Sequence, residues 1–144
     1  MAEDSINQSI SLVSKIHSQT ADFLVQKFKE KGMPDFASSH GNILFQLSKN
    51  ESMTMKELSR KINRDKSTTT VLVRKLICEG LVTSVPDKND RRSLKIQLTE
   101  KGREYNICTA QISEELIETF YKNFTEEEKQ KFFEFLKRAA DNFA

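Results

Sequence analysis

The side chains best suited to chemistry lie between Asp65 and Gly80. Asp65 is a typical N-cap residue and Gly80 a typical helix end, so we expect one helix here, with Thr69, Leu72, Val73 and Leu76 buried. The side chains outside that stripe gather toward the N-terminal end and are Lys66, Ser67, Thr68, Thr70, Val71 and Arg74. Their hydroxyl and cationic groups suit base edges and phosphates, and a valine suits a thymine methyl group. The segment is therefore expected to be a recognition helix for a major groove.

A β-hairpin with a basic tip is expected to follow this helix. The strands are predicted at Leu81–Val85 and Leu94–Leu98, the second of which alternates apolar and polar residues. The loop at residues 86–92 combines turn-forming residues with three cations, Lys88, Arg91 and Arg92. A polar-fronted helix beside such a hairpin fits the major groove of DNA and the minor groove next to it.

The charges of the chain are segregated. Residues 56–103 hold 13 Lys and Arg against 6 Asp and Glu, a net charge of +7, while the remaining residues hold 10 against 15, a net charge of −5. A randomly mixed surface would not divide its signs in this way. The basic segment is the one expected to face a polyanion.

The composition is that of a single soluble domain spanning residues 1–144, with 37% hydrophobic and 31% charged residues. No apolar run approaches the roughly 20 residues of a membrane span, and the N-terminus does not resemble a signal peptide. Two cysteines do not form a disulfide framework. We therefore expect a reduced cytoplasmic protein without membrane association.

The other predicted elements are helices that position this segment. A long amphipathic helix is expected over residues 4–31, a second from Ser38 or Ser39 to about Lys49, and a third from Met55 to Ile62, opened by the capping-box pair Thr54 and Glu57. Helix three, a tight turn and the helix after Asp65 have helix-turn-helix spacing. Thr99 caps a fifth helix, and Thr125 with Glu128 opens a sixth. The first helix is too long to bury its stripe against one small domain, which favours packing against a partner subunit.

This order of elements resembles the MarR (multiple antibiotic resistance regulator) family of transcription factors over essentially the whole chain. The most specific matches are Asp90-Arg91-Arg92, residues 98–102 (LTEKG) and residues 38–44 (SSHGNIL). The resemblance implies a mainly α fold with a small β-hairpin wing: a winged helix-turn-helix lobe at 36–99 and a dimerisation base from helices at 4–34 and 100–144. It also implies a homodimer that binds a double-stranded, pseudo-palindromic operator, usually as a repressor. A small molecule, such as a phenolic or other apolar effector, or an oxidant would relieve the repression.

The resemblance also implies roles in the wing. Arg92 would enter the minor groove, with the Asp90 carboxylate ordering its guanidinium, while Lys88, Arg91 and Lys95 would contact phosphates. The physics agrees, because a neighbouring carboxylate restricts a flexible arginine and narrow A·T-rich minor grooves attract one. Val71 departs from the family pattern, in which a polar or basic residue is common at this position.

Other readings of the sequence compete with this one. His17 and His40 are candidates for an effector cleft, but no ligand pair has the spacing of a metal site, and we expect no cofactor. Cys78 and Cys108 fit small packing residues better than redox sensors. The sequence shows no pairing of a nucleophile with a base that would suggest an enzyme. The alternative function is a helical dimeric protein-interaction module with a basic partner-binding face.

Overall fold

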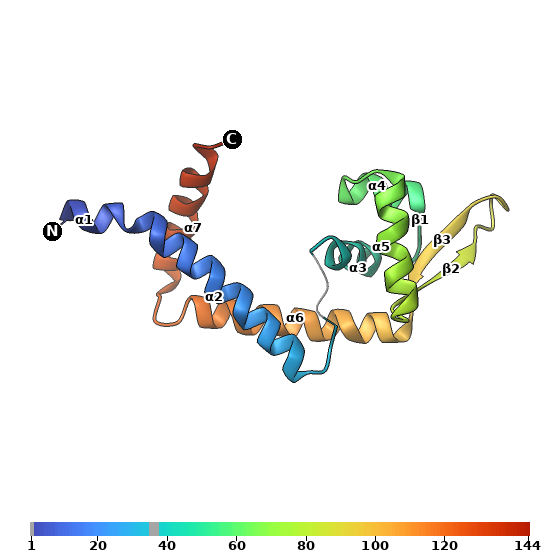
Figure 1. The fold of residues 1–144 in the computed structure, drawn as a ribbon, viewed down its shortest axis with the longest axis horizontal. Coiled ribbons are helices and arrows are strands. Elements are labelled where there is room, and N and C mark those ends of the chain that lie inside the picture. Colours follow the sequence, from blue (N-terminus) through green and yellow to red (C-terminus); the bar gives the residue numbers. More distant parts are fainter. Residues whose placement is uncertain (1, 35–37) are drawn as a thin grey trace.

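In the computed structural model, which describes residues 2–34 and 38–144, the chain forms two regions joined by one long helix (Figure 1). One region holds three helices and a small sheet, and the other holds both chain termini. The elements are α1 (Ala2–Asn7), α2 (Ser9–Glu30), α3 (Ser38–Lys49), β1 (Met53–Thr54), α4 (Met55–Ile62), α5 (Lys66–Cys78), β2 (Val82–Pro86), β3 (Leu94–Leu98), α6 (Glu100–Phe120) and α7 (Glu126–Asp141). This is the predicted winged helix-turn-helix fold, mainly helical with a small wing.

Side-chain caps start four of the helices at the residues that the sequence predicts. Capping boxes open α4 and α7, each with a threonine hydroxyl accepting from the N3 backbone N–H and the N3 glutamate accepting from the threonine N–H. The caps of α5 and α6 each accept from the third residue of the helix. The four cap residues are Thr54, Asp65, Thr99 and Thr125.

The N-terminal helix differs from the prediction, because the expected single helix over 4–31 is divided into α1 and α2 at Gln8. Gln8 keeps a right-handed helical conformation, and its carbonyl still accepts from the N–H of Leu12 at 2.9 Å. Its own N–H is shared between two carbonyls at 3.3 Å each, so the hydrogen bonds are long where the helix changes direction.

The wing also has one strand more than the expected hairpin. Strands β2 and β3 pair antiparallel, with Val82 opposite Leu98 and Pro86 opposite Leu94. The short strand β1, expected only as an extended link, pairs with the other edge of β3, with Met53 opposite Ile96. The order β1-β3-β2 fastens the start of α4 to the wing.

The hydrophobic core lies within the lobe built by α3, α4, α5, the sheet and the start of α6. Its fully buried side chains include Ile43, Leu44, Leu58, Leu76, Leu81 and Ile96. By contrast, neither α2 nor α7 buries a residue completely. None of the described helices is long and apolar enough to span a membrane.

Candidate nucleic-acid interface

The turn before α5 fixes where this helix, the predicted recognition helix, begins. Asn63 adopts the left-handed conformation (φ 54°) that asparagine tolerates better than most residues, and it ends α4. Two residues later, Asp65 Oδ1 accepts from the backbone N–H of Thr68 at 2.7 Å. The backbone and hydroxyl groups of Thr68 hold the pKa of Asp65 below its ordinary value of 3.8. The carboxylate therefore stays charged and holds the first turn of α5.

The wing tip is ordered by hydrogen bonds along its own backbone. Asp87 accepts from the N–H of Asn89 and Asp90 from the N–H of Arg92, both at 3.0 Å through a carboxylate oxygen. The Ser93 carbonyl accepts from the N–H of Asp87 at 3.0 Å, which closes the loop. The sequence predicts that Asp90 orders the guanidinium of Arg92. The structure shows Asp90 accepting from the backbone N–H of Arg92, which an aspartate two residues earlier in a turn reaches directly, and the role of Asp90 toward the guanidinium stays a prediction.

A groove of about 640 Å³ lies between α5, the start of α4 and the wing. Five residues of the predicted interface line it together: Lys66, Thr70, Arg74, Asp90 and Arg92. The polar side chains of α5 and Arg92 of the wing thus face one space, although they are up to 26 residues apart in the sequence. Three of these side chains are cations, so the groove suits a phosphate backbone.

The groove is also lined by residues outside the predicted interface. Thr54 and Lys56 line it from the start of α4, and Ser84 and Ser93 from the wing. Pairing of β1 with β3 brings Thr54 and Lys56 there. The helix-turn-helix spacing was a signal for Lys56, since the first helix of such a motif crosses the DNA backbone.

The remaining predicted contacts lie around this groove. Lys88 and Lys95 line a second hollow of about 600 Å³ at the wing, together with Glu51 and Ser52. Four further residues are exposed and outside both hollows: Ser67, Thr68, Val71 and Arg91. The predicted cations are thus distributed over more than one side of the wing.

The histidines and cysteines lie apart from this interface. His17 is exposed on α2, whereas His40 is buried in α3, and burial followed by the nearby charge of Lys75 lowers the pKa of His40. Cys78 is exposed and Cys108 half-buried. Among the described residues, no group of three His, Cys, Asp or Glu could hold a metal ion.

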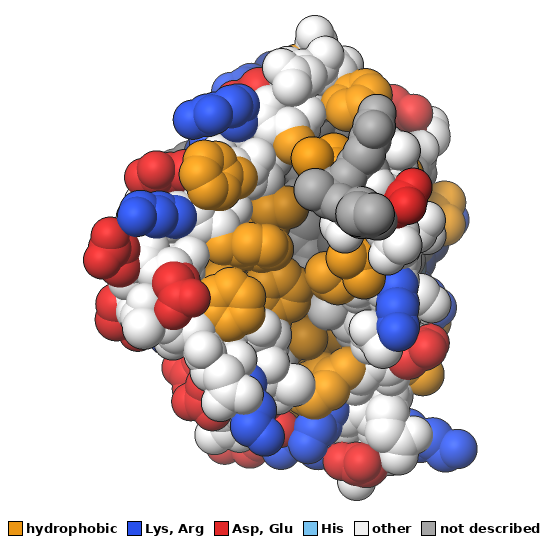
Figure 2. Space-filling view, turned by 90° about the vertical axis from the view of Figure 1, so that its left-hand side faces the viewer, with side chains coloured by type: hydrophobic (Ala, Val, Ile, Leu, Met, Phe, Trp, Pro, Cys, Tyr) orange, Lys and Arg blue, Asp and Glu red, His pale blue; other side chains and the backbone are white. Residues whose placement is uncertain are grey.

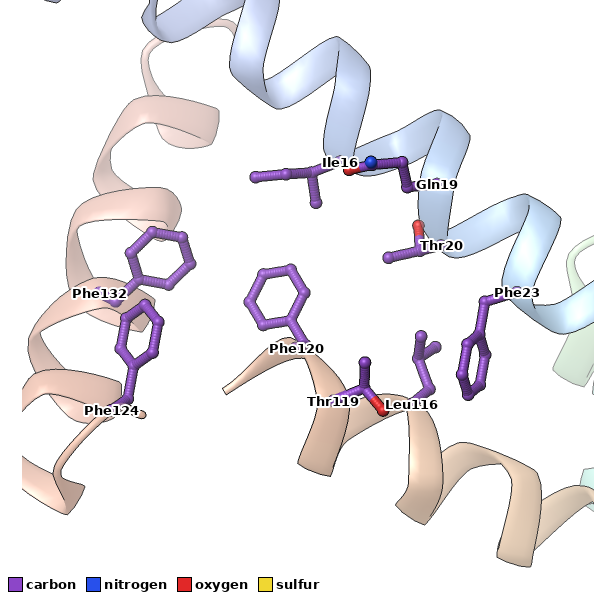
Figure 3. Close-up of a pocket in the computed structure, with 9 residues that line it drawn as sticks. All are labelled: Ile16, Gln19, Thr20, Phe23, Leu116, Thr119, Phe120, Phe124 and Phe132. Atoms are coloured by element: carbon purple, nitrogen blue, oxygen red, sulfur yellow. The ribbon is translucent and has the colours of Figure 1, made fainter. Parts of the chain in front are cut away.

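An apolar cleft of about 360 Å³ lies at the other end of the molecule, between α2, α6 and α7. Figure 2 views that end and shows hydrophobic side chains gathered along a hollow, with charged side chains toward its edges. In Figure 3, Phe120 lies between Ile16 of α2 and the rings of Phe124 and Phe132. The Phe120 and Phe132 ring centroids are 5.8 Å apart. Neither His17 nor His40 lines this cleft, so their effector role stays a prediction.

Comparison with known proteins agrees with the winged helix-turn-helix geometry of the lobe. The model of the MarR family matches residues 38–94. The transcriptional regulator SarZ of Staphylococcus haemolyticus is 30% identical over 100 residues, which are 69% of this chain and 67% of SarZ.

Solved structures share the fold over nearly the whole chain. The heme sensor protein PefR from Streptococcus agalactiae, in complex with heme, has a TM-score of 0.77 and 23% identity, and the match covers 94% of each chain. A mutant of MepR from S. aureus bound to an oligodeoxyribonucleotide has a TM-score of 0.64 and 20% identity, covering 93% of this chain and 96% of MepR. The family model, the similarity to SarZ and the winged lobe together show that the chain belongs to the MarR family of DNA-binding winged helix-turn-helix transcriptional regulators.

Proposed function

We propose that the protein is a homodimeric repressor that binds a pseudo-palindromic DNA operator. The observation that carries the proposal is the common groove of α5 and the wing, in which Lys66, Arg74 and Arg92 converge. The exposed N-terminal part of α5 would enter the major groove, while Arg92 would reach the adjacent minor groove. A repressor of this kind would act in the cytoplasm, where it would meet its operator.

The homodimer is supported by apolar surface that the single chain leaves open. Ile6, Ile10 and Val13 on α1 and α2 are 71%, 73% and 52% exposed, and Phe135 on α7 is 57% exposed. These side chains lie on helices at the end of the molecule that holds both termini (Figure 1), and exposed apolar side chains gathered at one end of a protein are typical of an interaction surface. A second copy contributes the same surface, and burial of both patches would hold two lobes at a fixed separation.

We propose that a small phenolic or other apolar effector controls operator binding. The cleft of Figure 3 combines a wall of aromatic rings with the polar side chains of Gln19, Thr20 and Thr119. A phenol would place its ring among the phenylalanines and its hydroxyl on one of these polar groups. Because the cleft lies within the proposed dimer base, a bound effector would alter the spacing of the two lobes and so weaken operator binding.

The test is selection of bound sequences from random DNA, followed by titration of the selected operator at several salt concentrations. We expect two half-sites one helical turn apart, about 34 Å, and a steep fall in affinity as salt rises. Repeating the titration with phenols would test the effector. A flat salt response, or retention of an acidic protein without any DNA, would overturn the proposal in favour of a protein-interaction module.

A further inference from the structure

Val71 is an exposed valine on the recognition helix. Its exposed fraction is 63%, whereas Thr69, Val73 and Leu76 on the inner side of α5 are buried. A β-branched side chain lowers helix propensity, and at this exposure it adds little to the core. A single exposed apolar residue is ordinary on a protein surface, so any role of Val71 in binding is set by the residues that surround it.

The neighbours of Val71 on the helix surface belong to the proposed DNA-binding face. Ser67 is four residues earlier and Arg74 three residues later, spacings that put side chains next to one another on a helix. Both are exposed, and Arg74 also lines the groove shared with the wing. Val71 therefore lies between a hydroxyl and a guanidinium on the face that would meet base edges.

Thr70, the residue before Val71, uses its hydroxyl proton within the helix. Thr70 Oγ1 donates to the carbonyl of Lys66 at 2.8 Å. A donor that is already bonded to a backbone carbonyl is less available to bases. Thr69 is buried on the inner side of α5. The surface beside Val71 therefore offers fewer free hydroxyl donors than the run of three threonines suggests.

Only one apolar group is displayed by bases in the major groove, the C5-methyl group of thymine. We infer that Val71 selects a thymine in each half-site by packing its isopropyl group against that methyl group. This inference rests on the proposed operator binding and names a specificity determinant within it. Selection has a second component, because an isopropyl group set against the amino group of cytosine or adenine would leave that donor without water or a partner.

The test removes only the methyl group. The operator obtained by selection is prepared with each thymine replaced in turn by uracil, symmetrically in both half-sites, and titrated with the wild-type protein, Val71→Ala and Phe45→Ala. Phe45 is 51% exposed on α3, outside both the groove and the proposed dimer base, and its substitution also shortens an exposed apolar side chain on a helix. Circular dichroism melting verifies that each variant folds, which we expect because alanine favours helix more than valine or phenylalanine.

At one symmetric thymine position, uracil should weaken binding by the wild type and by Phe45→Ala about fourfold per half-site, the contribution of one buried methyl group. Val71→Ala should bind the thymine and uracil operators equally at that position. Equal losses for wild type and Val71→Ala, with specific binding retained, would overturn this inference alone. If no sequence were selected from random DNA, the proposed function would fail together with it.

Discussion

The backbone of Gly102 lies against the carbonyl oxygen of Leu81, so closely that a Cβ atom at position 102 would come within 2.0 Å of that oxygen. The same carbonyl accepts from the N–H of Thr99 at 3.0 Å, and the Thr99 hydroxyl donates to the carbonyl of Gly80 at 2.6 Å. These contacts join the first turn of α6 to the start of the wing. Residues 98–102 therefore form the joint between the connecting helix and the DNA-binding lobe.

Gly102→Ala should destabilise the protein by about 3 kcal/mol, the upper end for added volume in a packed site, because a backbone carbonyl cannot rotate away as a side chain can. Thermal unfolding of the purified variant measures the loss. Gly41→Ala is the matched control, since a Cβ at Gly41 meets nothing within 4 Å and alanine favours the helix. An unchanged midpoint for Gly102→Ala would show that the joint can relax.

The Asp65 cap should make the stability of α5 depend on pH. Its pKa is lowered from 3.8 in the folded protein, so the folded state binds this proton less readily than the unfolded state does. The stabilisation is therefore fully present above the ordinary aspartate range and is lost as the pH falls through the lowered pKa. Asp65→Ala should lower the unfolding midpoint at neutral pH, and the difference from wild type should shrink on acidification.

Asp65→Asn separates the charge of this cap from its hydrogen bond. Asparagine is a good N-cap and accepts the same bond, so this variant should be more stable than Asp65→Ala at neutral pH. The amide side chain in this variant would not titrate, so its cap would not depend on pH. A constant difference between wild type and Asp65→Asn from neutral to acidic pH would contradict a charged cap at this position.

Local signals predict four helix starts well, because the caps of these helices form within four residues of sequence. The cap residues Thr54, Asp65, Thr99 and Thr125 could all be identified in this way. Strand β1 could not be identified, because two residues cannot display a period-2 pattern and its partner Ile96 is far along the chain. The break at Gln8 could not be predicted for a different reason: the backbone of Gln8 is still helical.

The candidate site was partly predictable for the same reason. The sequence identifies Lys66, Arg74 and Arg92 from their residue types beside a capped helix and a hairpin turn. Lys56 depends on the pairing of β1 with the wing, a long-range contact. The Asp90 contact depends on whether the carboxylate meets a backbone N–H or a guanidinium, which residue type alone does not decide.

Lys56 should contribute a phosphate contact to the groove. Lys56→Ala should weaken operator and random DNA by similar factors, and it should reduce the slope of log affinity against log salt by about 0.9, the effect of one lost phosphate contact. Titrations at four or more salt concentrations measure the slope. Lys122→Ala, in the turn between α6 and α7 far from the groove, is the control and should leave the slope unchanged.

Arg92 should contribute to sequence preference as well as to affinity. Arg92→Ala should cost about 1–3 kcal/mol of operator binding, with the largest loss when the flanking minor groove is A·T-rich and narrow. Lys88→Ala should instead weaken all sequences alike, since Lys88 lies in the separate hollow at the wing. Equal losses on A·T-rich and G·C-rich flanks for Arg92→Ala would remove the minor-groove contact from the mechanism.

The apolar surface at the termini should be required for assembly and, through assembly, for operator binding. The double variant Ile10→Asp with Phe135→Asp changes two side chains that are 73% and 57% exposed in the single chain, so the fold should survive while charges enter the proposed interface. Sedimentation should show a monomer, and operator affinity should fall by a factor of about 10² to 10⁴ as two-site binding is lost. Phe45→Asp, on α3 of the lobe and 51% exposed, should remain dimeric. A dimeric double variant with normal operator affinity would place the interface elsewhere.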